Sequence, residues 1–403
     1  MRTIAVVGMS LAGLRAVETL RRDGFDGRIV AIGAEPHLPY DRPPLSKELL
    51  AGSVEPEHIL LRPQGFDDLD LDWRLEARAV ALDVRAREVE LHDGERVAFD
   101  GLVIATGSCA RRLPGQPPLA GLFTLRTLDD ALALREVLHG RPRVVVIGAG
   151  FIGAEVAATC RRRGLDVTVL EALPQPMVRG LGPALGEVLA RVHRDHGVDL
   201  RTNVVVDAIE GDGGAVTGVR LGDGTVIDAD VVLVGIGAQP ETSWLEGSGL
   251  ALDDGVVCDA TGLVAPGIVA AGDVANWPNP LFDGRRMRLE HWTNAVEMGV
   301  HVASRLLAGD RGADRVFAPV PFVWSDQYDR KIQVVGHLAE ATDVHVCHGT
   351  LDEYRFVALF GRHGRLVGAL GFNRPRQVMQ YRRMIAERAT FADAVAAAGA
   401  GAP

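Results

Sequence analysis

The sequence predicts an α/β protein with two related halves, each built on a βαβ unit, followed by a small α+β C-terminal domain. Two observations predict the halves. The apolar runs Ile4 to Val7 and Arg143 to Ile147 each lead into a glycine-rich turn, and residues at helical spacing follow each turn. Pro319 and Pro321 then precede several short β-type runs, which predict the last domain. Because 403 residues exceed the size of one hydrophobic core, we expect separate domains.

In the first half, the turn from Gly8 to Gly13 precedes a helical pattern and a second β-type run, Arg28 to Ile32. The acidic residue Glu35 follows that run. Ser10 stands where a G-x-G-x-x-G motif has its second glycine. We expect this position to allow close approach of a ligand if the φ angle of Ser10 stays negative.

In the second half, Gly148, Gly150 and Gly153 complete the G-x-G-x-x-G motif between a strand and a helix. The first glycine permits a tight turn, the second lets backbone N–H groups approach a pyrophosphate, and the third allows close packing of helix and strand. The strand from Asp166 to Leu170 then ends at Glu171. Both halves therefore predict Rossmann-like dinucleotide-binding domains.

The acidic residues suggest which nucleotides bind. Glu171 is expected to accept hydrogen bonds from the adenosine ribose and to repel the 2′-phosphate of NADPH, which favours NADH. Arg161 to Arg163 and Arg179 leave NADPH open, although basic residues at a helix end also suit the helix dipole. Glu35 is expected to bind the ribose of a second nucleotide. A tightly held FAD that receives hydride from NADH would explain two dinucleotide sites in one chain.

The remaining elements follow the same patterns. We expect antiparallel strands around residues 86–91, a frayed Ala- and Gly-rich tail, and a small sheet followed by a helix in the last domain. Buried strands are predicted at 102–107, 230–237 and 267–273, an amphipathic helix at 294–307, further strands at 331–335, 356–360 and 366–370, and a helix at 376–387.

Charge, hydropathy and cysteine spacing argue against several classes of protein. A formal charge of −10 argues against a nucleic-acid partner, which needs a basic surface. No apolar stretch is long enough for a membrane span, and the chain opens directly into an apolar run, so we expect a cytoplasmic protein. The four scattered cysteines have no metal-ligand spacing and predict reduced thiols without a metal.

The segment from Tyr40 to Lys47 is a rigid Pro-Pro loop that carries a cation. Lys47 and Lys331 are the only lysines among 43 basic residues. A lysine at this position runs against the arginine bias of the chain, which favours a functional role for Lys47.

Six motifs resemble the bacterial ferredoxin reductases of the putidaredoxin reductase and dioxygenase-reductase type, within the glutathione-reductase-like flavoproteins. The resemblance covers nearly the whole chain. The motifs lie at residues 39–47, 105–107, 125–130, 150–155, 272–273 and 322–328. The resemblance implies an FAD-binding domain at 1–112 and 243–320, an NAD(H)-binding domain at 113–242 and a C-terminal reductase domain at 321–403.

The resemblance also implies roles for single residues. Lys47 would lie by the N5 and O4 edge of the flavin and pair with Glu155 near the nicotinamide, which makes these two the expected catalytic residues. The implied FAD-binding residues are Gly8, Ser10, Leu11, Ala12, Gly13, Glu35, Arg42, Lys47, Val80, Ala105, Thr106, Gly107, Arg126, Gly272, Asp273, Glu290, His291, Trp292 and Trp324. The implied NADH-binding residues are Gly148, Gly150, Phe151, Ile152, Gly153, Glu155, Glu171, Gly235, Ile236 and Gly237.

The resemblance leaves open which electron acceptor the protein reduces. No cysteine lies between Leu38 and Ala51, which argues against the disulfide reductases and NADH peroxidases that relay electrons through a cysteine. The motif at 322–328 favours a ferredoxin that serves a P450 or Rieske oxygenase, over rubredoxin or another acceptor. A flavoprotein similar to apoptosis-inducing factor, which senses NADH, is the alternative from another class.

A monomer or weak homodimer is expected. Basic residues that could meet an acidic ferredoxin are Arg285, Arg286, Arg288, Arg374, Arg376, Arg382 and Arg383.

Overall fold

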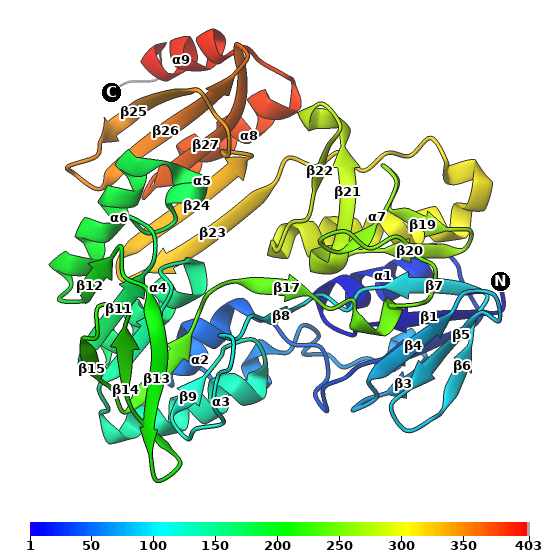
Figure 1. Cartoon of the computed structure of the whole chain (residues 1–403). Helices are drawn as coiled ribbons and strands as arrows, with labels where there is room; N and C mark the ends of the chain where they lie inside the picture. The colour runs from blue at the N-terminus through cyan, green and yellow to red at the C-terminus, as the bar shows by residue number, and fades with distance from the viewer. Residues whose placement is uncertain (401–403) are drawn as a thin grey trace. The chain divides into compact units, whose positions relative to one another are not determined.

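The computed structural model describes residues 1–400, without the side chains of Arg179 and Ala400. The chain forms two compact units (Figure 1). The first unit comprises Met1–Asp41, Leu60–Cys109 and Gln239–Val323, and the second comprises Arg42–Ile59, Ala110–Ala238 and Trp324–Pro403. The domains predicted from the sequence were divided by the nucleotide that each part is expected to bind, whereas these units are divided by compactness. The predicted domain boundaries therefore stay a prediction.

The first unit is built on a six-stranded sheet with the order β19-β20-β7-β1-β2-β3. Strand β1 lies between β2 and β7 and runs parallel to both, with Ile4 opposite Ile29 and Gly101. Nearly every residue of these three strands is buried, as expected for a parallel sheet covered on both faces. Its strands are β1 (Thr3–Val7), β2 (Arg28–Ile32), β3 (Leu71–Arg74), β7 (Gly101–Ile104), β19 (Leu263–Ala265) and β20 (Ile268–Ala270).

Helices α1 and α7 of this unit pack against each other, and Gly299 of α7 lies against the backbone of Ala12. Two small sheets complete the unit, one of them an antiparallel meander of β4, β5 and β6. The helices are α1 (Leu11–Arg22) and α7 (Trp292–Ala308), and the remaining strands are β4 (Ala79–Asp83), β5 (Glu88–Leu91), β6 (Arg96–Ala98), β18 (Val256–Val257), β21 (Ala275–Asn279) and β22 (Arg285–Met287).

The second unit repeats this plan. Its five-stranded parallel sheet has the order β12-β11-β10-β16-β9, and β10 lies between β11 and β16, as β1 lies between β2 and β7. The repeat extends to the edge residues, because Asp100 before β7 and Asp230 before β16 each accept a backbone N–H at the start of the neighbouring strand. The strands are β9 (Leu122–Phe123), β10 (Val144–Ile147), β11 (Val167–Glu171), β12 (Asp199–Thr202) and β16 (Val231–Val234).

Short helices and a second antiparallel meander surround this sheet. The segment that carries Lys47 also belongs to this unit and contacts helix α4. The helices are η1 (Pro43–Ser46), α2 (Glu48–Ala51), α3 (Leu128–Val137), α4 (Phe151–Arg162), α5 (Val178–Leu181) and α6 (Pro183–Asp195), and the meander comprises β13 (Val206–Asp212), β14 (Ala215–Leu221) and β15 (Val226–Asp228).

The C-terminal part forms an antiparallel sheet in the order β23-β24-β27-β26-β25 with two helices packed on it (Figure 1). The prediction of an α/β protein with two Rossmann-like halves and a small α+β domain is thus confirmed. The elements are β23 (Phe322–Gln327), β24 (Arg330–Gly336), β25 (Asp343–Thr350), β26 (Arg355–Arg362), β27 (Arg365–Phe372), α8 (Pro375–Ala386) and α9 (Phe391–Ala400).

The expectation of a frayed tail is wrong for residues 391–400, which form α9. Phe391 packs directly on Gly361 of the sheet, and Ala394 and Ala398 are buried. Thr390 accepts the backbone N–H of Asp393, which begins the helix. Phe391, Ala394 and Ala398 therefore pack one face of this helix, which is not a loose end.

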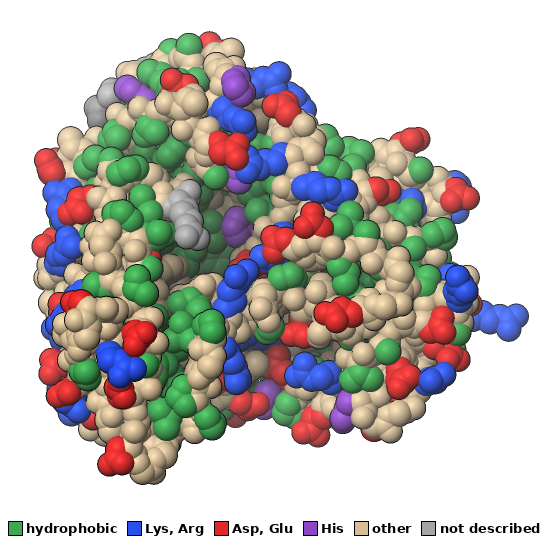
Figure 2. Space-filling view, in the orientation of Figure 1, with side chains coloured by type: hydrophobic (Ala, Val, Ile, Leu, Met, Phe, Trp, Pro, Cys, Tyr) green, Lys and Arg blue, Asp and Glu red, His purple; other side chains and the backbone are tan. Residues whose placement is uncertain are grey.

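None of the helices in residues 1–400 has both the length and the apolar character that a membrane span needs. In the same range, no cluster of three or more His, Cys, Asp or Glu is placed to hold a metal ion. On the face drawn in Figure 2, acidic and basic side chains are interspersed rather than gathered into one basic patch.

Candidate functional site

The two glycine turns have the same close-packed geometry. Gly8 and Gly148 have φ angles of +104° and +100°, which favour glycine. A Cβ atom on Gly8 would lie 2.1 Å from the carbonyl oxygen of Ala105, and one on Gly148 would lie 2.4 Å from that of Gly235. Each turn therefore passes against the loop that follows the next parallel strand. This is the switch point where α/β sheets bind ligands.

The third glycine of each motif brings helix and strand together. A Cβ atom on Gly13 would lie 2.0 Å from the Gly8 carbonyl oxygen, and one on Gly153 would lie 2.1 Å from that of Gly148. No side chain fits in either place. The first turns of α1 and α4, including Leu11, Ala12, Phe151 and Ile152, are therefore held directly over the ends of β1 and β10.

The middle position of each motif has extended backbone, and in the second motif it is open instead of packed. Gly150 has φ −76° and ψ −174°, and a Cβ atom there would meet nothing within 4 Å. Ser10 has φ −102° and ψ −156°, so its backbone is extended in the same way. The condition set for Ser10, a negative φ angle, is met. The N-terminus of α4 thus has backbone N–H groups beside open space, as a pyrophosphate site requires, and the backbone at the start of α1 has the same extended geometry.

The loops after neighbouring strands line the same sheet edges. In the first unit, the segments 105–107 and 272–273 follow β7 and β20, and Ser108 donates a hydrogen bond to Asp273 over 3.1 Å. In the second unit, Gly235 to Gly237 follow β16, and the side chains of Ile152 and Ile236 are 44% and 37% exposed. Such exposed apolar side chains beside a glycine turn suit contact with a flat ring.

Both acidic residues lie where the motif requires. The carboxylate of Glu171 accepts the backbone N–H of Ala149 over 2.8 Å, inside the glycine turn, and that of Leu173 over 2.8 Å. These bonds hold the carboxylate at the end of β11. Glu35 is half-buried after β2 and accepts a hydrogen bond from the hydroxyl of Tyr40.

The other residues expected around FAD in the first unit lie on several elements. Glu290 and His291 precede α7, and the indole of Trp292 donates a hydrogen bond over 2.7 Å to Asp41. That bond fixes the ring of Trp292 at the start of the helix. Val80 on β4 is 43% exposed. The roles of these residues stay predictions.

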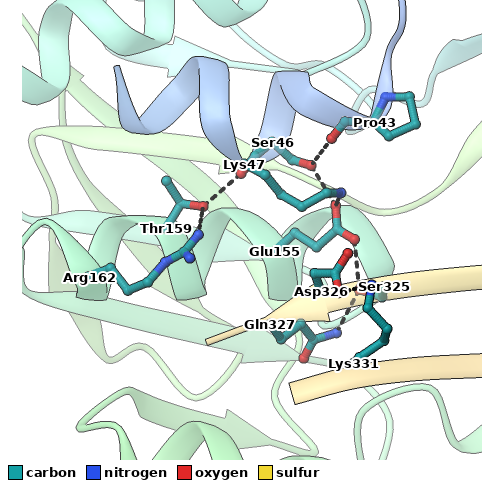
Figure 3. A network of polar contacts seen from close by, with 10 residues as sticks. All are labelled: Pro43, Ser46, Lys47, Glu155, Thr159, Arg162, Ser325, Asp326, Gln327 and Lys331. Atoms are coloured by element: carbon teal, nitrogen blue, oxygen red, sulfur yellow. Dashed lines mark hydrogen bonds and ion pairs between the residues drawn. The ribbon is translucent and has the colours of Figure 1, made fainter. Parts of the chain in front are cut away.

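In the second unit, Lys47 and Glu155 form a buried ion pair (Figure 3). Lys47 Nζ lies 2.7 Å from Glu155 Oε2, and the two side chains are 9% and 4% exposed. Lys47 follows η1, and Glu155 lies in the buried face of α4. The pairing expected from the resemblance is therefore present in this structure.

Three further contacts hold the pair, and the sequence analysis missed their residues. Ser46 donates a hydrogen bond to Glu155 Oε2, Ser325 of β23 donates to Glu155 Oε1 over 2.7 Å, and Thr159 donates to the Ser46 carbonyl over 2.8 Å. Glu155 and Thr159 are one helical turn apart on α4, so one helix face holds the Lys47 segment. The spacing of these two residues was a usable signal.

Arg42, Arg126 and Trp324 also belong to the second unit. The guanidinium of Arg42 donates to the backbone carbonyl of Arg126, and the Arg126 N–H donates over 2.9 Å to Asp130, which caps α3. Trp324 is half-buried on β23. These bonds hold the loop of Arg42 against the loop of Arg126. The roles of all three residues stay predictions.

Two regions of the chain match known protein families. Residues 2–299 match the family described as pyridine nucleotide-disulphide oxidoreductase. The chain belongs to this family. Residues 322–401 match a second family, described as reductase C-terminal.

Individual relatives of this pyridine nucleotide-disulphide oxidoreductase are ferredoxin reductases. Rhodocoxin reductase of Rhodococcus erythropolis is 39% identical over 388 residues, covering 95% of this chain and 89% of the relative. The ferredoxin reductase component of chlorobenzene dioxygenase from Cupriavidus sp. is 38% identical over 390 residues, covering 96% and 93%. The crystal structure of the covalent putidaredoxin reductase–putidaredoxin complex matches with a TM-score of 0.91 and 32% identity, covering 96% and 93%. The resemblance to bacterial ferredoxin reductases is confirmed, and the chain is an oxidoreductase.

Although the family name includes disulphides, the cysteines of this oxidoreductase do not lie in the segment where a cysteine relay is expected. All four are free, and none lies in the segment Arg42–Ile59. Burial raises the pKa of both Cys160 and Cys258 to about 12, which keeps these thiols protonated and unreactive. The position beside Glu155 is occupied by the cation Lys47. This supports the interpretation that the chain uses no cysteine relay.

Proposed function

We propose that this oxidoreductase uses FAD, takes hydride from NADH, and reduces a ferredoxin that serves a cytochrome P450 or a Rieske oxygenase. The observation that carries the proposal is the buried Lys47–Glu155 pair in the segment where a cysteine relay would lie. The names of the relatives, rhodocoxin reductase and the reductase component of a dioxygenase, support the class of acceptor. The cytoplasmic location and the monomer or weak homodimer stay predictions.

The first unit has the features that FAD needs. The N-terminus of α1 after the extended Ser10 would offer backbone N–H groups to a pyrophosphate, and Glu35 would offer a carboxylate to the adenosine ribose. Asp273, oriented by Ser108, would hold the ribityl chain. When bound, FAD supplies the chemistry that accepts a hydride and releases single electrons.

The second unit has matching features for NADH. Gly150 leaves space at the N-terminus of α4 for a pyrophosphate, and Glu171, held against the Ala149 N–H, would accept hydrogen bonds from the ribose hydroxyls. The negative charge of Glu171 disfavours a 2′-phosphate. Gly235 to Gly237 and the exposed Ile236 would face the nicotinamide end.

Lys47 and Glu155 would act on charge rather than form bonds. The ammonium group of Lys47 would stabilise the negative charge that hydride transfer places on the flavin ring. Glu155 compensates this cation in the resting protein, because an unpaired charge at this burial would be strongly unfavourable. Keeping an ion pair buried is costly for stability, which favours a role in the reaction.

Coenzyme preference tests the proposal. Under anaerobic conditions, NADH is expected to bleach the flavin at least about tenfold more efficiently than NADPH, since rejection of a 2′-phosphate by a carboxylate contributes about 1.4 kcal/mol or more. Glu171→Gln should reduce this ratio several-fold by raising the NADH concentration required. A tenfold preference of the unmodified protein for NADPH would contradict the assignment of Glu171.

A further inference from the structure

The contacts around Glu155 indicate a role for the motif at residues 322–328 besides the one in acceptor preference. We infer that Ser325, from the C-terminal sheet, is a positioning residue that orients Glu155 toward Lys47 for the hydride-transfer step. The inference rests on the proposed function, since it assigns a role in the reaction to the Lys47–Glu155 pair. It gives a residue of the C-terminal domain a part in the reaction with the coenzyme.

The carboxylate of Glu155 is held from three sides (Figure 3). Oε2 accepts from Lys47 Nζ over 2.7 Å and from the hydroxyl of Ser46. Oε1 accepts from the hydroxyl of Ser325 over 2.7 Å. Ser325 is the only side chain bonded to Oε1 in the described part of the chain, so together with the two donors on Oε2 it restrains the rotation of the carboxylate about its last side-chain bond.

Gln327 fixes the direction of that hydrogen bond. Its Nε2 donates to Ser325 Oγ over 3.1 Å, so the Ser325 oxygen accepts there and its hydrogen is free to point to Glu155. Ser325 and Gln327 are both fully buried and lie two positions apart, on the same face of β23. With no water-accessible surface, neither group has solvent as a substitute partner.

The geometry therefore distinguishes Ser325 from a residue that only packs β23 on α4. Without its hydroxyl, Glu155 Oε1 would have no donor from this strand, and the carboxylate could rotate away from Lys47. The glycine turn and Glu171, which would anchor most of the coenzyme, would be untouched. The expected effect is on the rate of the reaction and not on the binding of NADH.

The test compares Ser325→Ala with a matched control, Ser53→Ala. Ser53 is an exposed serine of the same unit, and its hydroxyl donates to the Glu48 carbonyl over 3.1 Å. The limiting rate of flavin reduction by NADH, measured by anaerobic stopped flow, should fall about tenfold in Ser325→Ala, the effect of losing one charge-assisted hydrogen bond. The Kd for NAD⁺, measured by calorimetry, should change less than about twofold. Ser53→Ala should change neither quantity.

A double-mutant cycle shows whether Ser325 acts through Glu155. In the Glu155→Gln background, adding Ser325→Ala should slow reduction less than about twofold and should not lower the thermal unfolding midpoint further. Ser325→Thr, which keeps the hydroxyl, should recover most of the rate. If Ser325→Ala does not fold, Ser325→Cys provides a folded variant with a weaker donor and should give an intermediate rate.

The outcomes separate the inference from the function on which it rests. A normal rate in Ser325→Ala or in Ser325→Cys would overturn the inference, as would an undiminished loss in the Glu155→Gln background. A normal rate in Glu155→Gln alone would instead overturn the role of the ion pair in the proposed function.

Discussion

At the scale of single residues, the central feature is an ion pair taken almost fully out of water. Lys47 and Glu155 are 9% and 4% exposed, and hydroxyl groups complete the hydrogen bonding of the carboxylate. Removing one partner of such a pair usually costs about 3 to 5 kcal/mol, whereas replacing both with neutral groups is often neutral. Stability and reaction rate can therefore be separated by mutation.

Lys47→Met should lower the free energy of unfolding by about 3 kcal/mol, because it leaves the Glu155 carboxylate buried without its cation. The double variant Lys47→Met, Glu155→Gln should recover most of that stability in chemical denaturation. Its flavin reduction by NADH should remain slowed about tenfold or more, because the cation is still missing. A double variant that recovers both stability and rate would reduce the pair to a structural salt bridge.

The sequence predicted the residues of this pair but not their support. Lys47 was noticeable because lysine is rare in this chain, and Glu155 was implied by the family resemblance. Ser46 and Ser325 lie inside two of the motifs that carry the resemblance, at 39–47 and 322–328, but nothing local links either serine to Glu155. Their role depends on bringing three segments of the chain to one carboxylate, which is a property of tertiary packing.

At the scale of elements, the strand–turn–helix of the second half depends on two different glycine requirements. Gly153→Ala should lower the free energy of unfolding by about 2 to 3 kcal/mol, because its Cβ atom would lie 2.1 Å from the Gly148 carbonyl oxygen. Gly150→Ala should change stability by less than about 1 kcal/mol, since its φ angle is −76° and its surroundings are open. Equal losses in urea unfolding would contradict the assigned geometry.

The contact between α6 and the β23–β24 turn contains a buried histidine. His193 Nδ1 lies 2.9 Å from the hydroxyl of Tyr328, and the ring of His196 stacks on that tyrosine. Burial, with a smaller contribution from His196, lowers the pKa of His193 to about 4 from 6.5. The folded protein therefore keeps this imidazole neutral, while the unfolded chain binds a proton below pH 6.5.

The stability contributed by neutral His193 is present above pH 6.5 and is lost as the pH falls toward 4. The loss amounts to roughly 3 kcal/mol over the full interval. His193→Gln should flatten the pH dependence of the unfolding free energy between pH 7 and 5, measured by urea denaturation. An unchanged slope would show that His193 is not the group that titrates.

The elements that the sequence predicted well are those with strong periodicity. The amphipathic pattern at 294–307 became α7, and the run at 356–360 became part of β26. Helix α9 was missed because an alanine-rich segment shows little amphipathic contrast. The Thr390 and Asp393 capping pair was its available signal.

At the scale of the whole molecule, the chain repeats one plan twice and adds a third part. The repeat was predictable because each half carries the same order of strand, glycine turn, helix and acidic residue. The grouping of residues 42–59 with the second unit was not predictable. It depends on contacts with α4 and α3, far away in the sequence, rather than on any local pattern.

In the proposed function, reducing equivalents pass from NADH through FAD to a ferredoxin. Its most direct test is anaerobic titration of the flavoprotein with NADH, followed by mixing with an oxidised [2Fe–2S] ferredoxin. We predict stoichiometric bleaching of the flavin, then rapid reduction of the ferredoxin. A long-lived charge-transfer band that ferredoxin does not discharge would contradict this account and indicate a protein that senses NADH.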